Sequence, residues 1–186
     1  MSVVSPIERR VVERFLEGDK EAFREIYEKT KGYLYSIVYK MVYSRAEAED
    51  LIHDIYIVVY KKRRTFNFSA QFTTWLYRVA VNHVINHLKR KRIMESKLVQ
   101  FFFTKDQETE DPDPFESQES GQAAKALLDK VKPEFRVCLV MHELEEIPYN
   151  RIAEHLGISI GTVKSRLNRA KKELSKAYEE EHGHGE

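Results

Sequence analysis

Apolar residues recur three and four positions apart along most of the chain, which places them on one face of an α-helix. The first such stretch ends at Gly18, and longer ones follow at 20–42, 45–64, 73–92 and 123–178. Seven glycines and five prolines are few for 186 residues. This scarcity favours long helices over hairpin-rich β structure.

Short capping sequences mark where several of these helices begin. Residues 5–8 and 44–47 both begin with Ser and end with Glu, as in the capping box. In that motif the serine hydroxyl accepts a backbone N–H and the glutamate reaches back. Asp19 is expected to cap the second helix, in which Gly32 marks a break or bend.

The composition changes sharply between residues 104 and 122. This stretch holds seven acidic residues, one lysine and two prolines, and it has no apolar periodicity. Such a segment buries too little apolar surface to fold, so we expect a solvated linker. The predicted fold is therefore all-α: two helical domains at 1–95 and 123–178, a flexible acidic linker at 96–122, and a polar tail at 179–186.

Composition also narrows the classes of protein. Cys138 is the only cysteine, which excludes a disulfide framework and a multi-cysteine zinc site. No apolar run approaches the ~20 residues that a membrane span needs, and no secretory leader is evident. We expect a cytoplasmic protein that does not insert into a membrane. The net charge of +1 carries no information about nucleic acid.

The sharpest chemical pattern lies at 147–172. Apolar residues 152, 153 and 156 give a short helix one buried face, Gly157 suits a left-handed turn, and Ser159 suits the cap of a second helix. This order is typical of a helix-turn-helix, and also of a plain helical hairpin with a solvated basic face. The candidates for DNA contact on the second helix are Thr162, Lys164, Ser165, Arg166, Asn168, Arg169 and Lys172.

A second candidate surface combines aromatic and basic residues in the first domain. Aromatic rings can stack unpaired bases while cations follow the backbone, and the loop 67–71 could wall a pocket for a flipped base. The alternative is that Phe72 and Trp75 belong to the core and that the basic run is a solvated helix end. The candidates are Asn67, Phe68, Ser69, Ala70, Gln71, Trp75, Tyr77, Arg78, Asn82, Asn86, Lys89 and Arg90.

Other patterns are weaker. His83 and His87 have the four-residue spacing of metal ligands on a helix, but no third ligand is evident. The sequence has no phosphate-binding glycine loop, nucleophile elbow or carboxylate pair with a clear pocket. We therefore expect no metal, no cofactor and no enzymatic activity.

Three motifs occur in order at 48–54 (AEDLIHD), 72–80 (FTTWLYRVA) and 152–167 (IAEHLGISIGTVKSRL). Through them the chain resembles the bacterial RNA polymerase sigma factors of the extracytoplasmic-function (ECF) type, over residues 8–177. The resemblance implies that the first domain is sigma region 2 and the second is region 4. The chain departs from the family pattern at His53, where glutamine is common, and at Pro148, where a capping serine is frequent.

The resemblance also implies a function: a dissociable subunit that binds core RNA polymerase and directs promoter-specific initiation. Region 2 would bind the polymerase clamp helices, and the loop 67–71 would take a flipped base of the minus-ten element. Region 4 would read the minus-thirty-five element and touch the polymerase flap. An anti-sigma factor, often membrane-linked, would hold the protein inactive until a stress occurs. The implied polymerase contacts are Asp50, Leu51, His53, Asp54, Tyr56 and Ile57.

Two other functions compete with this interpretation. A helix-turn-helix repressor or activator would act without joining the polymerase, as a free dimer on half-sites about one helical turn apart. The aromatic and basic strip argues against it, because duplex binding has no use for base stacking. An enzyme acting on nucleic acid would need a metal-ligand set or a nucleophile constellation, and neither is evident.

Overall fold

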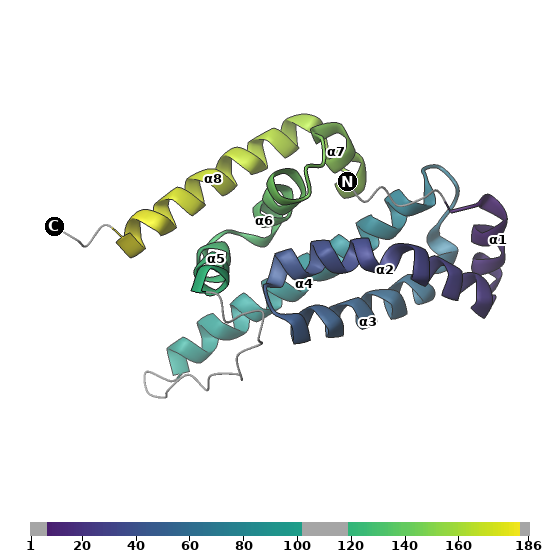
Figure 1. Cartoon of the computed structure of the whole chain (residues 1–186), viewed down its shortest axis with the longest axis horizontal. Coiled ribbons are helices and arrows are strands. Elements are labelled where there is room, and N and C mark those ends of the chain that lie inside the picture. Colours follow the sequence, from purple (N-terminus) through teal and green to yellow (C-terminus); the bar gives the residue numbers. More distant parts are fainter. Residues whose placement is uncertain (1–6, 102–118, 183–186) are drawn as a thin grey trace.

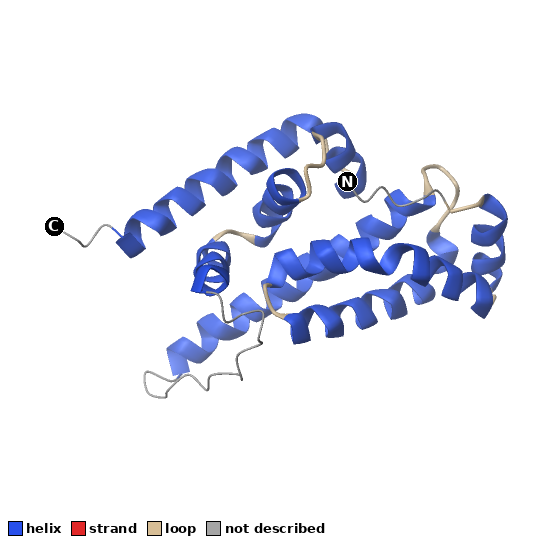
Figure 2. Ribbon diagram, viewed as in Figure 1, coloured by secondary structure: helices blue, strands red, loops and turns tan. Residues whose placement is uncertain are grey.

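The computed structural model describes residues 7–101 and 119–182, with side chains at 7–94 and 123–180. Within these ranges the chain forms helices joined by turns and contains no strand (Figure 1, Figure 2). The predicted all-α fold is confirmed. Residues 102–118 of the predicted linker and 183–186 of the predicted tail lie outside the described residues.

The N-terminal half is a helical bundle in which α2 and α3 lie side by side over the long α4 (Figure 1). Its core is built from large apolar side chains that are almost fully buried, among them Phe15, Ile26, Leu34, Ile55 and Leu76. The elements in order are α1 (Arg9–Glu17), α2 (Lys20–Val42), α3 (Arg45–Lys62), the 3₁₀ turn η1 (Arg63–Thr65) and α4 (Phe72–Phe101).

Local capping chemistry sets most of these boundaries. Gly18 ends α1 with φ 98°, the left-handed conformation that glycine adopts readily. Asp19 caps α2 by accepting from the backbone N–H groups of Glu21 and Ala22, as predicted. Ser44 caps α3 by accepting from the N–H of Glu47 at 3.3 Å.

Three details of the predicted boundaries are wrong. The first helix begins at Arg9, so Glu8 is its N-cap and not the last residue of a capping box; Ser5 lies outside the described residues. α2 runs through Gly32 without a break. α4 continues to Phe101, because no glycine or proline interrupts residues 92–101.

The C-terminal half consists of shorter helices packed against the long α8. Pro133 occupies the first turn of α6, where its missing N–H has no partner to lose. A π-helical turn then carries the chain to α7, and Gly157 turns it into α8. The elements are α5 (Glu119–Lys130), α6 (Pro133–Leu139), the π turn η2 (Val140–Leu144), α7 (Tyr149–Leu156) and α8 (Ile160–His182).

The two halves pack against each other and share one continuous buried core. α4 contacts α6 and α7, and α2 contacts η2 (Figure 1). Arg136 of α6, only 4% exposed, donates from Nη1 to the carbonyl of Met41 at the end of α2. The sequence does not indicate this packing. None of the described helices is both long and apolar enough to cross a membrane.

Candidate nucleic-acid and partner interfaces

The C-terminal half contains the predicted helix-turn-helix. α7 ends at Leu156, and Gly157 follows it in the left-handed conformation with φ 66°. The hydroxyl of Ser159 accepts from the backbone N–H of Thr162 at 3.1 Å and so caps α8. Ile152 of α7 and Val163 of α8 are fully buried between the two helices. These contacts hold the angle between the helices, which a groove-reading motif needs.

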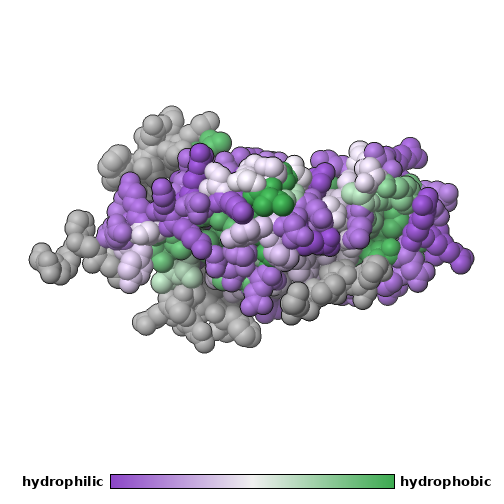
Figure 3. Space-filling model, turned by 90° about the horizontal axis from the view of Figure 1, so that it is seen from above, coloured by the Kyte–Doolittle hydropathy of each residue, from purple (hydrophilic) through white to green (hydrophobic). Residues whose placement is uncertain are grey.

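One face of α8 presents polar and basic side chains to solvent. Lys164, Ser165, Asn168, Arg169 and Lys172 are all exposed. The surface seen in Figure 3 is mostly hydrophilic, with an apolar patch near its middle and an apolar band towards its right-hand end. Such a face can donate hydrogen bonds to base edges and phosphates.

Arg166 and Thr162 are less available than the other predicted contacts on α8. Arg166 is half-buried beside Cys138 of α6, and burial raises the pKa of that thiol to about 11, which Arg166 opposes only in part. The Thr162 hydroxyl lies 2.9 Å from that of Ser159. Thr162 therefore supports the turn through Ser159, whereas Arg166 packs towards α6.

The loop after η1 carries an exposed aromatic ring on a constrained backbone. Phe68 is 39% exposed and has φ 60°, which is uncommon for a bulky residue. The side chain of Asn67 holds the loop by accepting from the N–H and the hydroxyl of Ser69. The guanidinium of Arg9 lies over the Phe68 ring at 4.8 Å. An exposed ring next to a cation is suited to stacking on an unpaired base.

Trp75 lies behind this loop in an aromatic cluster. Its ring is 5.7 Å from that of Phe66 and 5.5 Å from that of Phe72, and both neighbours are buried. Trp75 itself is half-buried. Phe72 is therefore a core residue, whereas Trp75 packs against the core and stays partly exposed.

The polar residues of α4 form a strip along one side of the helix. Asn82, Asn86, Lys89 and Arg90 are exposed, and Arg90 donates back to the carbonyl of Asn86 at 3.3 Å. Lys89 already has an ion partner in the other half of the molecule, Glu134, at 3.5 Å. The exposed polar side chains therefore follow one another along α4, and at Lys89 the strip contacts α6.

Tyr77 and Arg78 are engaged by the C-terminal half. Tyr77 is 4% exposed, its ring lies 4.9 Å from that of His155, and its hydroxyl has no hydrogen-bond partner. Arg78 donates from Nη2 to the carbonyl of Glu154 at 3.0 Å. In this arrangement the predicted strand contact by Tyr77 is not possible, because the ring is covered.

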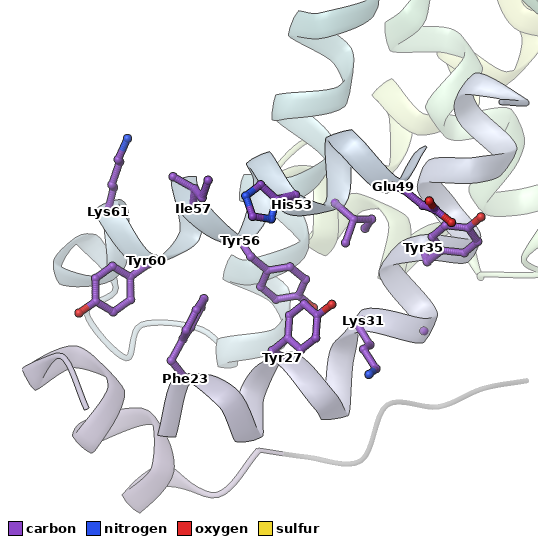
Figure 4. Close-up of a pocket in the computed structure, with 12 residues that line it drawn as sticks. Phe23, Tyr27, Lys31, Tyr35, Glu49, His53, Tyr56, Ile57, Tyr60 and Lys61 are labelled. Atoms are coloured by element: carbon purple, nitrogen blue, oxygen red, sulfur yellow. The ribbon is translucent and has the colours of Figure 1, made fainter. Parts of the chain in front are cut away.

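A groove of about 760 Å³ lies between α2 and α3 (Figure 4). Tyr56 is one of its lining residues; its hydroxyl lies 2.6 Å from that of the buried Thr30, and burial raises the pKa of Tyr56. The groove is lined by Phe23, Tyr27, Lys31, Gly32, Tyr35, Glu49, Ile52, His53, Tyr56, Ile57, Tyr60 and Lys61.

The groove contains part of the predicted polymerase-binding set. His53, Tyr56 and Ile57 line it, whereas Asp50 and Asp54 are exposed residues of α3 that do not. Leu51 is 3% exposed and faces the core, so a direct contact by its side chain is not possible here.

The sequence did not reveal the α2 side of the groove. Phe23 and Tyr27 have the helical spacing of the apolar residues in α2, which by itself indicates core positions, but both are only half-buried. The four-residue spacing from Tyr27 to Lys31 and Tyr35 was the available pattern for a second, partly polar face.

One member of the candidate metal pair, His87, takes part in a polar cluster that links α3 and α4. His87 lies 2.8 Å from Glu47, which also pairs with Lys91 at 2.8 Å. Burial would raise the pKa of Glu47, but these two partners lower it overall. In the part of the chain that the structure describes, no three His, Cys, Asp or Glu side chains are grouped to hold a metal.

The models of two domain families match this chain: sigma-70 region 2 at residues 26–93, and sigma-70 region 4 at residues 121–174. The ECF RNA polymerase sigma factor SigW of Bacillus subtilis is 27% identical over 183 residues, covering 90% of this chain and 95% of that protein. The ECF sigma-E factor of Haemophilus influenzae is 30% identical over 173 residues, covering 88% and 91%.

Solved structures share the fold. CnrH in complex with the cytosolic domain of CnrY matches with a TM-score of 0.63 at 18% identity, covering 92% of this chain and 96% of that one. The sigma factor RpoE of Bartonella quintana, in complex with the anti-sigma factor NepR, matches with 0.58 at 22%, covering 86% and 98%. By sequence and fold, this chain belongs to the ECF sigma factors of RNA polymerase.

Proposed function

We propose that three surfaces give this sigma factor its contacts with the transcription machinery: the α2–α3 groove, the loop and strip of α4, and the exposed face of α8. As an ECF sigma factor, the chain binds core RNA polymerase and directs it to promoters. We also propose that the core enzyme alone synthesises RNA, that it does so in the cytoplasm, and that this chain contributes only binding.

The groove is the surface for core polymerase. It is lined mainly by aromatic and aliphatic side chains, with charged residues such as Lys31, Glu49 and Lys61 at its rim. An apolar groove with a charged rim accepts the apolar face of a partner helix, and tyrosines are favoured at such interfaces. Among the described residues, this groove is the observation that carries the proposal.

The loop and strip bind the melted minus-ten strand. Phe68 offers an exposed ring for stacking, and Trp75 offers a half-buried edge behind it. Asn82, Asn86 and Lys89 follow on the same side of α4. Stacking rings beside a basic track are the features that single-stranded nucleic acid requires.

The face of α8 binds the minus-thirty-five duplex. Its exposed lysines, arginine, serine and asparagine provide contacts for bases and phosphates, and the cap at Ser159 fixes the start of the helix. This assigns region 2 to residues 1–95 and region 4 to residues 123–178, and the matched ranges of the two domain families support the division.

An anti-sigma factor is the further partner. Two structural relatives were solved in complexes, one with the cytosolic domain of CnrY and one with the anti-sigma factor NepR. We expect this chain to be held by a partner of the same kind. A free repressor that never joins the polymerase is not favoured, because region 2 would then have no role.

Ile57→Glu tests the groove. Ile57 is 38% exposed in the groove, so the charge should abolish binding to core polymerase without unfolding the bundle. Met94→Glu is the matched control, because Met94 is 63% exposed on α4 and does not line the groove. Core binding and promoter-directed transcription are measured for both. Equal loss in the two variants, or none in Ile57→Glu, would contradict the assignment.

A further inference from the structure

Helix α1 brings a cation to the loop that precedes α4. Arg9 is the first residue of α1, and its guanidinium lies over the ring of Phe68, 4.8 Å from the ring centroid. Phe68 belongs to the loop between η1 and α4, so the two side chains come from segments that are far apart in the sequence. The contact adds α1 to a surface that otherwise consists of this loop and α4.

Packing and hydrogen bonds fix α1 beside this loop. Phe15 is fully buried, and its ring lies 5.7 Å from that of Phe72, the first residue of α4. Just beyond the end of α1, the carbonyl of Gly18 accepts from the hydroxyl of Tyr60 at 3.4 Å. Because α1 is anchored along its length, the placement of Arg9 near the loop follows from the fold.

The ring of Phe68 is held at the surface. The buried ring of Phe66 contacts it, with 4.9 Å between the two centroids. The backbone of Phe68 has φ 60°, which is unfavourable for a bulky residue and must be held by its surroundings. Phe68 nevertheless stays 39% exposed. A constrained, exposed ring is suited to receive a flat partner without rearranging.

The guanidinium of Arg9 is held much more weakly. Its Nε donates to the carboxylate of Glu13 at 2.8 Å, one turn further along α1. The side chains of this pair are 75% and 51% exposed. An exposed ion pair within one helix contributes little, because water screens the attraction. The side chain of Arg9 can therefore shift at small cost while its backbone stays in place.

A flat base fits between the two groups after a small displacement. Stacked groups lie about 3.5 Å apart, so a base held between a ring and a guanidinium needs about 7 Å between them. The present separation is 4.8 Å, so the guanidinium must move by about 2 Å. Bases stack on arginine planes as well as on aromatic rings. The two side chains can therefore contact opposite faces of one base.

We propose that Arg9 is the second wall of the base site: an unpaired base of the melted strand stacks on Phe68 with one face and on the guanidinium of Arg9 with the other. This inference rests on the function proposed above for the loop, and it adds a residue and a helix to that site. α1 lies before residue 26, where the match to the sigma-70 region 2 model begins.

Arg9→Ala tests the second wall in the complete polymerase, core plus this chain. Binding is measured to a single-stranded oligonucleotide with the minus-ten element of a promoter that this polymerase transcribes. Arg9→Ala should weaken binding by about two- to thirtyfold, the range of one cation–π contact. Arg10→Ala is the matched control, because Arg10 is the next residue, is exposed and has the same charge. It should bind like wild type, and an equal loss in both variants overturns the proposal.

Abasic oligonucleotides separate a contact with the base from a contact with phosphate. Each base of the element is removed in turn, which leaves the sugar and phosphate in place. At the position whose base stacks on Phe68, Arg9→Ala should no longer lower the affinity, because its partner is missing. If Arg9→Ala weakens binding to the intact strand and to every abasic strand equally, Arg9 does not hold a base and the proposal is overturned.

Arg9→Lys keeps the charge but lacks the planar guanidinium, so it should lose most of the affinity that Arg9→Ala loses. Wild-type affinity in Arg9→Lys overturns stacking by Arg9.

Phe68→Ala distinguishes this inference from the proposed function. If Phe68→Ala lowers the affinity and Arg9→Ala does not, the loop still binds the melted strand and the second wall is wrong. If neither variant lowers the affinity, the second wall and the proposed role of the loop are both wrong.

Discussion

Arg78 lies directly against Gly157: a Cβ built on Gly157 would be 2.9 Å from the Cζ of Arg78. Two features of this turn therefore favour glycine. One is the left-handed backbone at φ 66°, and the other is a side chain from the opposite half of the molecule. Only the first reason can be read from the sequence.

Gly157→Ala should lower the free energy of unfolding by more than the ~1–2 kcal/mol that a left-handed alanine costs. The excess arises because Arg78 must move. In an Arg78→Ala background the loss should shrink to the backbone cost alone. Urea unfolding of the four proteins in the cycle measures the coupling, and additivity within about 0.5 kcal/mol would contradict the contact.

Acidification should weaken the folded structure through His155. Burial, and after it the nearby Arg151, lowers the pKa of His155 from 6.5 to about 4, which Glu154 opposes. Between these values the unfolded chain binds a proton that the folded chain does not. The free energy of unfolding therefore falls as the pH drops through this window, by about 3 kcal/mol at most.

His155→Gln serves as the control for this pH dependence. In this variant the free energy of unfolding should fall less steeply between pH 6.5 and 4, because the contribution of His155 is absent. Urea unfolding at each pH measures the difference. A slope identical to wild type would assign the effect to other groups.

Phe68→Ala should weaken binding to the single-stranded minus-ten element by about 1–3 kcal/mol, the usual contribution of one base stacked on an aromatic ring. The ring is exposed, so stability should change little. Phe68→Tyr preserves stacking and should bind like wild type. The prediction is wrong if both variants lose affinity equally, since that would point to the loop backbone.

Lys164→Ala should weaken initiation at promoters that depend on the minus-thirty-five element by about tenfold, within the range for one base contact. Lys176→Ala removes an exposed lysine three turns further along α8 and is the matched control. Transcription from a premelted template without that element should be unaffected in both. A similar loss on that template would show that Lys164 does not act through the minus-thirty-five element.

The sequence predicted features that depend on neighbouring residues. The caps at Asp19, Ser44 and Ser159 and the turn at Gly157 follow from short-range hydrogen bonding and backbone preference, and the structure contains all four. The continuity of α2 through Gly32 was missed, because tertiary packing outweighs the weak helix propensity of one glycine.

The sequence did not predict features that depend on distant residues. Arg136 and Met41 are 95 positions apart, and no local pattern links them. The groove was missed for a related reason: apolar periodicity identified Phe23 and Tyr27 as apolar but did not show which neighbours cover them. Along a helix, half-buried aromatic residues recur at the same spacing as fully buried ones.

Because Arg78 bonds the carbonyl of Glu154 and Lys40 pairs with Glu145 across the two halves, both at solvent-accessible positions, dissolved salt acts on this protein in two opposite directions. Rising ionic strength screens Arg78 and Lys40, which favours separation of the halves. The same salt weakens the phosphate contacts of the basic face of α8. At low salt the two halves stay together, and at high salt the DNA dissociates. Promoter engagement by the free chain should therefore pass through a maximum at intermediate ionic strength.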